Sequence, residues 1–320
     1  MAVLLGIDEA GYGPLLGPLV VSGVAFRVPD DRIDACLWDT LKASCARRVT
    51  KSGRKLAVAD SKKLFRSRQT LGLLERAALV MLAASGHRPR TLREMLGVVA
   101  PEATADLDRI PWYAARDVPL PSTDEVGDID TRANKVRRDA ESNRVAMLGV
   151  YCEPLTADRY NRLVAGTRNK AVVALGMALR IIDLVTRSAG EETVRVCVDR
   201  QGGRTHYRES LMTAMPDCEL QIIEESPERS AYQLVAAARR CRIEFVAGGE
   251  EHHFVVALAS VYSKYLRELY MRLFNGFWCE AAPDLRPTAG SSTDAQRWLG
   301  DADEVIRRLS VDRRVLVRDR

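Results

Sequence analysis

Two adjacent carboxylates stand at the end of the first apolar run of this chain. Residues 3–7 form a short apolar stretch typical of a buried strand, and Asp8 and Glu9 follow it directly. Charge at the end of a buried strand is costly without a partner, and a divalent cation is a suitable partner for neighbouring carboxylates. Behind the acids, residues 11–18 form a Gly- and Pro-rich loop whose backbone can approach a ligand closely. The pattern predicts a metal-dependent site that handles phosphate.

Two further acids extend this pattern. Asp199 closes a second apolar strand, and Glu268 lies on a long apolar helix. Hydrolysis of a phosphodiester by two metal ions requires carboxylates that flank ions about 3.5–4 Å apart. Both acids also have a simpler interpretation, which the spacing leaves open. Glu268 follows Lys264 by four residues, as in an ordinary surface ion pair, and Asp199 precedes Gly202 and Gly203, as a turn acid would.

The composition describes a globular protein. The chain has 320 residues, 47% of them hydrophobic, which is enough for one large domain or two smaller ones. No stretch approaches the roughly 20 apolar residues that span a bilayer, and the N-terminus lacks a basic segment before its apolar run. Seven scattered cysteines without a C-x-x-C pair argue against a disulfide framework and a thiolate zinc site. We therefore expect a soluble, cytoplasmic protein without a membrane partner, and a monomer.

The net charge of +5 permits a polyanionic partner without requiring one. The basic residues are concentrated in one segment, which contains Arg47, Arg48, Lys51, Arg54, Lys55, Lys62, Lys63, Arg66 and Arg68. Two interpretations remain open for this segment, a solvated face and a surface that contacts phosphates.

The remaining pattern predicts a mixed sheet covered by helices. Residues 19–28 form a strand close enough to the first to pair with it in antiparallel fashion. Later residues alternate between strand and helix, which favours parallel pairing. The expected strands are 145–151, 193–198, 219–223 and 243–247, and the expected helices are 33–46, 69–84, 157–165, 169–188, 205–215, 226–241, 253–275 and 294–309. The proline-rich segment 86–143 is predicted to be an insertion or flap, helical near 91–97 and 131–145.

Several motifs in order resemble the ribonuclease HII family, the type 2 ribonucleases H. The resemblance rests on residues 8–21, on Asp60-Ser61-Lys62-Lys63-Leu64, on the strand that ends at Asp199, and on the helix motif from Ala259 to Glu268. It implies an α/β, ribonuclease H-like fold with a mixed sheet flanked by helices. The catalytic domain would cover 1–275, with the insertion at about 86–143, and a helical C-terminal extension would cover 276–320.

The resemblance also implies an activity and its residues. The enzyme would use Mg²⁺ or Mn²⁺ to cut the RNA strand of an RNA/DNA hybrid, or to cut at a ribonucleotide embedded in duplex DNA, leaving 5′-phosphate and 3′-hydroxyl ends. Carried over to this sequence, the four catalytic and metal-binding acids are Asp8, Glu9, Asp199 and Glu268, and the substrate-binding residues are Gly11, Tyr12, Gly13, Lys62 and Lys63.

The sequence departs from the family pattern at three positions. Tyr12 stands where the family usually has an arginine between two glycines, Glu268 replaces an aspartate, and Ser291 stands where a tyrosine is expected. These changes affect recognition of the RNA–DNA junction more than metal binding. Two alternatives therefore remain: a nucleic-acid-binding protein with weak or no catalysis on the same scaffold, and a ribonuclease H-like nuclease with another substrate.

Overall fold

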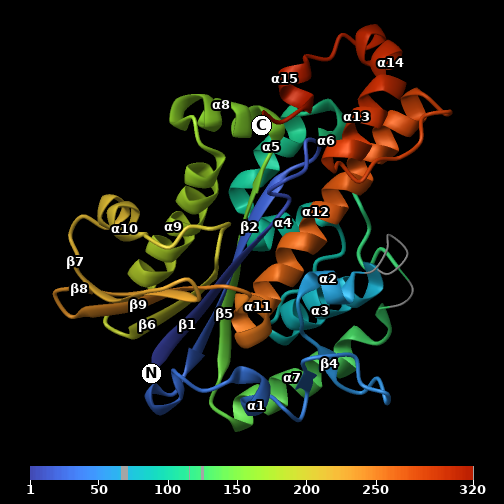
Figure 1. The fold of residues 1–320 in the computed structure, drawn as a ribbon. Coiled ribbons are helices and arrows are strands. Elements are labelled where there is room, and N and C mark those ends of the chain that lie inside the picture. Colours follow the sequence, from blue (N-terminus) through green and yellow to red (C-terminus); the bar gives the residue numbers. More distant parts are fainter. Residues whose placement is uncertain (66–70, 115, 124–125, 320) are drawn as a thin grey trace.

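The computed structural model describes residues 1–65, 71–114, 116–123 and 126–319. Their main feature is a seven-stranded mixed sheet in the order β5-β2-β1-β6-β9-β8-β7, with helices on both faces (Figure 1). The expected mixed sheet flanked by helices is thus confirmed. The strands of this sheet are β1 (Ala2–Ala10), β2 (Leu19–Val28), β5 (Ala146–Leu155), β6 (Thr193–Asp199), β7 (Glu219–Glu225), β8 (Arg229–Ala236) and β9 (Arg239–Val246), and β3 (Cys45–Ala46) pairs separately with β4 (Leu56–Ala57).

Strand direction decides which strand ends meet. β1 pairs with β2, and β2 with β5, in antiparallel fashion, whereas β1, β6 and β9 run parallel to one another. Ile7 lies opposite Val198, and Asp199 lies opposite Val246. Because the carboxyl ends of parallel strands meet at one edge of a sheet, residues that follow β1, β6 and β9 are brought together there.

Two helices cover the two faces of β1. Side chains alternate along a strand, so Leu4 packs into the core beneath α12 (Phe254–Ala281), and its neighbours Val3 and Leu5 pack into the core beneath α9 (Lys170–Ser188). α12 crosses so close to the strand that a Cβ on Gly6 would lie 2.2 Å from the carbonyl carbon of Val255. This close approach fixes α12 against the end of β1 that carries the acids.

The other helices surround these layers (Figure 1). The segment predicted to be an insertion is mainly helical and joins the core beneath α12; Leu96 and Trp112 within it are buried. The helices are η1 (Asp30–Arg32), α1 (Leu37–Thr40), α2 (Ser61–Leu64), α3 (Leu71–Ala84), α4 (Leu92–Val99), η3 (Pro101–Ala103), α5 (Thr104–Arg109), α6 (Pro111–Ala114), α7 (Ile129–Ser142), α8 (Ala157–Thr167), α10 (Arg208–Ala214), α11 (Gly249–His252), α13 (Ser292–Asp301), α14 (Asp303–Arg308) and α15 (Arg313–Leu316).

Two helix predictions are wrong. The region expected to be a helix over 226–241 forms the hairpin of β8 and β9, because alternate residues such as Tyr232 and Leu234 are buried and the chain reverses at Ala237, whose φ is 52°. In the region 33–46, all of which the structure describes, the only helix is the four-residue α1, and Cys45–Ala46 form β3. There the amide and hydroxyl of Ser44 both donate to the carboxylate of Asp139, at 2.8 and 2.7 Å, so the chain leaves the helical path. The expected helix over 69–84 is α3 from Leu71 onward; residues 69 and 70 lie outside the described residues.

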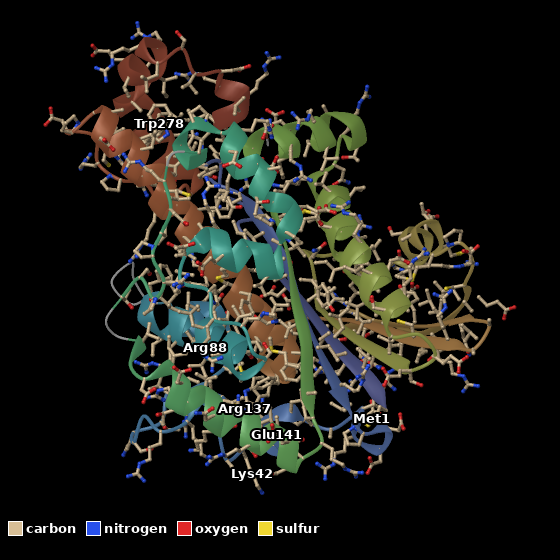
Figure 2. All side chains as sticks on the ribbon, turned by 180° about the vertical axis from the view of Figure 1, so that it is seen from behind. Met1, Lys42, Arg88, Arg137, Glu141 and Trp278 are labelled. Atoms are coloured by element: carbon tan, nitrogen blue, oxygen red, sulfur yellow. The ribbon has the colours of Figure 1, made fainter. Side chains whose placement is uncertain are left out.

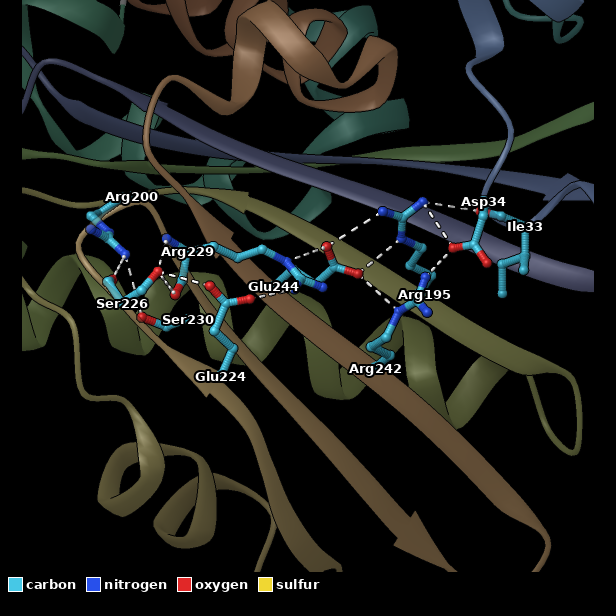
Figure 3. A network of polar contacts seen from close by, with 10 residues as sticks. All are labelled: Ile33, Asp34, Arg195, Arg200, Glu224, Ser226, Arg229, Ser230, Arg242 and Glu244. Atoms are coloured by element: carbon cyan, nitrogen blue, oxygen red, sulfur yellow. Dashed lines mark hydrogen bonds and ion pairs between the residues drawn. The ribbon is translucent and has the colours of Figure 1, made fainter.

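A charged network covers part of the sheet face that α12 leaves open (Figure 3). Glu244 on β9 is only 2% exposed and forms ion pairs with Arg195 at 3.1 Å, Arg229 at 3.2 Å and Arg242 at 2.8 Å. Burial raises the pKa of Glu244, but the hydrogen bond from Arg195 and the positive charges of Arg195 and Arg229 outweigh it, so the pKa lies below its ordinary value.

Glu244→Gln is expected to lower the free energy of unfolding by about 3 kcal/mol at pH 7, because three partly buried arginines lose their shared, buried counter-charge. The folded-state pKa of Glu244 is depressed, so its contribution is present above the unfolded-state pKa near 4.3 and is lost as the pH falls through the folded-state value. Urea unfolding at pH 7 and near pH 3.5 measures both effects. The matched control is Glu224→Gln, which removes a half-exposed partner of Arg229; an equal loss in both variants would contradict this role.

Candidate functional site

The structure places Asp8 and Glu9 where β1 leaves the sheet beside α12. Asp8 is 7% exposed, and its carboxylate accepts a hydrogen bond of 2.8 Å from the Glu9 amide. Its carbonyl oxygen accepts another of 2.9 Å from the Ser263 hydroxyl on α12. The Glu9 carboxylate accepts a hydrogen bond of 3.4 Å from the Gln201 side-chain amide, in the turn that follows β6. The end of β1 is thereby tied to both α12 and the end of β6.

Asp199 lies at the same edge and is joined there by Glu250. The Asp199 carboxylate accepts a hydrogen bond of 2.8 Å from the Gly249 amide, at the start of α11 directly after β9. The carboxyl groups of Asp199 and Glu250 approach within hydrogen-bonding reach of each other. One side-chain oxygen of Glu250 is buried and has no hydrogen-bond partner among the described residues. Asp8, Glu9, Asp199 and Glu250, here called the acid cluster, therefore meet at the carboxyl ends of β1, β6 and β9.

Burial and mutual repulsion raise the pKa values of this cluster. Burial raises the pKa of Asp8 well above its usual range, and the charges of Glu9 and Asp199 raise it further. Burial likewise raises the pKa of Glu9 to about 7, with Glu250 adding to the shift and the Gln201 hydrogen bond opposing it. Burial, together with the charge and hydrogen bond of Glu250, raises the pKa of Asp199 to about 7. A bound proton or a bound cation would each relieve this repulsion.

The structure does not bring Glu268 to this cluster. The Glu268 carboxylate is half-buried and forms an ion pair of 2.6 Å with Lys264, the simpler interpretation that the spacing leaves open. Ser263 touches the backbone of Asp8, and five further residues turn an α-helix by about 140° and advance it by about 7.5 Å. Glu268 instead borders a small surface cavity with Phe65 and Pro287.

Sequence reasoning missed Glu250, although a signal for it exists. The expected strand 243–247 is followed by Gly248, which adopts a left-handed φ of 64°, and then by Gly249 and Glu250. An acid that follows a tight turn after a third parallel strand is placed at the same sheet edge as Asp8 and Asp199. The next residues, Glu251-His252-His253, have the composition of a helix start. Glu250 is therefore easily assigned to that helix start and not to the edge of the sheet.

Two buried arginines hold the loop behind Glu9. Arg267 on α12 donates hydrogen bonds to the carbonyl oxygens of Pro18, at 2.5 Å, and Leu16, at 3.0 Å. Arg318, near the end of the chain, donates to those of Gly11, at 2.5 Å, and Pro14. Both arginine residues are at most 3% exposed. Arg318 is about 300 residues from this loop along the chain, so its contact with the loop can be found only in the folded structure.

The loop residues expected to bind substrate lie beside the acid cluster. Gly11 adopts a φ of 87°, and a Cβ there would lie 2.6 Å from the Pro18 carbonyl oxygen, so the loop requires glycine. Gly13 is exposed and its surroundings are open. Tyr12 lies beneath the Lys170 ammonium, 5.2 Å from the ring centre, and borders a cavity of about 330 Å³. Burial and the charge of Glu9 raise the pKa of Tyr12, which places its hydroxyl within electrostatic reach of the cluster.

The two predicted lysines also reach this region. Asp60 caps α2 by accepting a hydrogen bond of 2.9 Å from the Lys62 amide. The positive charge of Lys62 lowers the pKa of Glu9, so its side chain lies near the cluster. Lys63 forms an ion pair of 2.7 Å with Glu251, the residue next to Glu250.

The donor set of the acid cluster suits a hard divalent cation. Oxygen ligands from carboxylates are those that Mg²⁺ and Mn²⁺ prefer. Burial and neighbouring charges favour the protonated form of Asp8, and one Glu250 oxygen is without a partner among the described residues; a bound cation would relieve both. Across the described ranges, no group of three or more His, Cys, Asp or Glu side chains is set in the arrangement that holds a metal ion. The residues therefore fit a metal by chemistry, and their side chains must move to bind one.

Comparisons with known proteins agree with the resemblance seen in the motifs. No family model matches this chain. Forty-six residues are 48% identical to a ribonuclease HII of Gluconobacter oxydans (strain 621H), a match that covers 14% of this chain and 22% of that protein. The chain resembles ribonuclease HII. The matched stretch spans about a fifth of the relative's length. A match of this extent does not assign the relative's activity to this chain.

Solved ribonucleases H are similar to this chain at low sequence identity. The ribonuclease HII in a PCNA complex from Archaeoglobus fulgidus matches with a TM-score of 0.46 and 17% identity, covering 99% of this chain and 94% of that one. The ribonuclease H2 of Pyrococcus horikoshii OT3 matches with a TM-score of 0.43 and 15% identity, covering 98% and 92%. No described helix is long and apolar enough to span a membrane.

Proposed function

We propose that this protein is a divalent-metal-dependent endoribonuclease of the ribonuclease HII type. It cuts the RNA strand of an RNA/DNA hybrid, or cuts at a ribonucleotide embedded in duplex DNA, and leaves 5′-phosphate and 3′-hydroxyl ends. The observation that carries this proposal is the convergence of Asp8, Glu9, Asp199 and Glu250 at one sheet edge, beside a glycine loop.

The roles follow from the positions of the side chains. The four carboxylates hold Mg²⁺ or Mn²⁺, which when bound supplies the positive charge for water activation and for the departing oxygen. Lys62 lies beside Glu9 and contacts a phosphate of the substrate. The backbone of Gly11 and Gly13 faces the ribose 2′-hydroxyl, the group that distinguishes RNA from DNA. Glu268, paired with Lys264, has no part in metal binding in this scheme.

Cleavage of three labelled duplexes tests the proposal. The substrates are an RNA/DNA hybrid, a DNA duplex with a single ribonucleotide, and a plain DNA duplex, each with Mg²⁺, Mn²⁺ or EDTA. We expect metal-dependent cutting of at least one ribonucleotide-containing duplex and none of plain DNA. Equal cutting of plain DNA would instead select a ribonuclease H-like nuclease with another substrate.

One observation favours a second candidate, a nucleic-acid-binding protein with little catalysis. Tyr12 and Ser291 replace the arginine and tyrosine usual in the family, and Ser291 here precedes the first residue of α13. Tight binding of the same duplexes without cutting in either metal would select this candidate.

A further inference from the structure

The loop between β3 and β4 carries an unusual density of unpaired positive charge. The loop itself, residues 47–55, holds five basic residues and no acid, and the wider segment 42–63 holds eight basic residues and one acid, Asp60. Surface arginines elsewhere commonly have a partner, as Arg187 has in Asp183 at 2.8 Å. In contrast, no ion pair within the described residues involves Arg48, Lys51, Arg54, Lys55 or Lys62. Arg66 and Arg68 lie outside the described residues.

The first residue of this loop is attached beside the acid cluster. Arg47 donates a hydrogen bond of 2.9 Å to the carbonyl oxygen of Glu251 on α11, and its guanidinium lies 3.9 Å from the centre of the Trp38 ring. Downstream of the loop, Lys62 acts on the charge of Glu9. The chain therefore leaves the candidate site at Arg47, carries the unpaired cations of the loop, and returns to the site at Lys62.

The loop is supported on its other side by α7. Arg132 donates a hydrogen bond of 2.8 Å to the Gly53 carbonyl oxygen, and Lys135 donates one of 3.4 Å to that of Arg54. The acceptors of both bonds are backbone carbonyl oxygens, so these bonds do not pair Arg132 or Lys135 with a carboxylate. The segment predicted to be an insertion thus holds the loop and adds positive charge to it.

The loop extends from Arg47, which is bonded to α11 beside the acid cluster. Lys51 is four residues from Arg47, so the Cα atoms of these two residues lie within about 14 Å of each other. A duplex rises about 3.4 Å per base pair, so this distance corresponds to about four base pairs. Figure 2 shows two further cations, Lys42 and Arg137, near α1 and α7, together with the acid Glu141 on α7.

On the basis of the proposed function, we infer that loop 47–55, with α2 and α7, binds the phosphate backbone of the duplex arm that leaves the acid cluster. The partner is a double-stranded nucleic acid, because its phosphates supply regularly spaced negative charge along one direction. Contacts of this kind position the substrate without reading its sequence and make binding dependent on salt.

The test compares Lys51→Ala/Arg54→Ala with the matched control Arg239→Ala/Arg240→Ala. The control removes two charges next to the β8–β9 turn, at the end of β9 opposite the acids. Binding of a labelled RNA/DNA hybrid of about 24 base pairs is measured in EDTA at several salt concentrations. We expect the Lys51/Arg54 variant to bind about tenfold more weakly and its salt slope to fall by about 2, whereas the control matches the wild type.

Cleavage by the same variants separates this inference from the proposed activity. If the wild type cuts, the Lys51/Arg54 variant should show a raised KM and a kcat within about twofold of the wild type. If the wild type does not cut, the binding measurement still reports on the surface. Unchanged affinity and slope in the Lys51/Arg54 variant, or an equal loss in the Arg239/Arg240 control, would overturn the inference.

Discussion

Glu250→Gln is expected to reduce cleavage at least about 100-fold, while Glu268→Gln stays within about threefold of the wild type. Both substitutions replace a glutamate by a glutamine, so any difference in activity between the two variants reflects where each residue lies in the structure. Glu250 faces Asp199 and has a buried oxygen without a partner, whereas Glu268 is paired with Lys264. Loss of one carboxylate from the acid cluster weakens the hold on the metal and removes charge where the reaction requires it.

The comparison is made on an RNA/DNA hybrid over a range of Mg²⁺ concentrations. We expect the Glu250 variant to need more Mg²⁺ for half-maximal activity, a shift that misfolding alone would not produce. Thermal unfolding of both variants controls for stability. The reverse order, with Glu268→Gln inactive and Glu250→Gln active, would show that α12 supplies the fourth ligand and would contradict the proposed site.

The sequence predicts well the elements whose pattern is local and redundant. β1, β2 and β6 combine apolar runs with turn residues, and α9 has both a cap at Asn169 and a glycine after its end. The β8–β9 hairpin is mispredicted because its proline, alanines and arginines favour a helix locally. Burial of Tyr232 and pairing with β9 override that preference, and neither is visible before the sheet is assembled.

The site shows the same division between local and long-range information. Asp8, Glu9 and Asp199 are predictable because each ends an apolar strand that its own neighbours specify. Glu250 depends on β9 being the third parallel strand, and Arg318 depends on the chain end returning to the first loop. Motif resemblance favours Glu268 because it follows a recognisable helix motif, whereas helix geometry turns it away from the acids.

Asp8→Asn is expected to abolish cleavage and at the same time to stabilise the metal-free protein. Activity should fall by about 10³-fold or more, which corresponds to about 4 kcal/mol of lost transition-state stabilisation. Hybrid binding should remain largely intact, because the phosphate contacts lie elsewhere. The free energy of unfolding should rise by about 1–2 kcal/mol at pH 7 in EDTA, because the variant removes a buried carboxylate whose pKa burial and neighbouring charges raise.

The pH dependence gives this effect a definite sign. Because the folded-state pKa of these carboxyl groups is raised, the folded protein keeps protons that the unfolded chain has already lost. The free energy of unfolding of the metal-free wild type should therefore fall as the pH rises from about 4 to about 7, the range set by Glu9 and Asp199. The Asp8 variant should lose less, and added Mg²⁺ should raise the melting temperature of the wild type more than that of the variant. Ser263→Ala, which removes a hydrogen bond to the Asp8 backbone and no charge, is the control. If Asp8→Asn is less stable than the wild type in EDTA, or keeps full activity in saturating Mg²⁺, Asp8 supports the fold and does not bind the metal. Loss of activity together with a gain in stability is expected only if Asp8 belongs to a cluster of mutually repelling carboxylates that binds the metal.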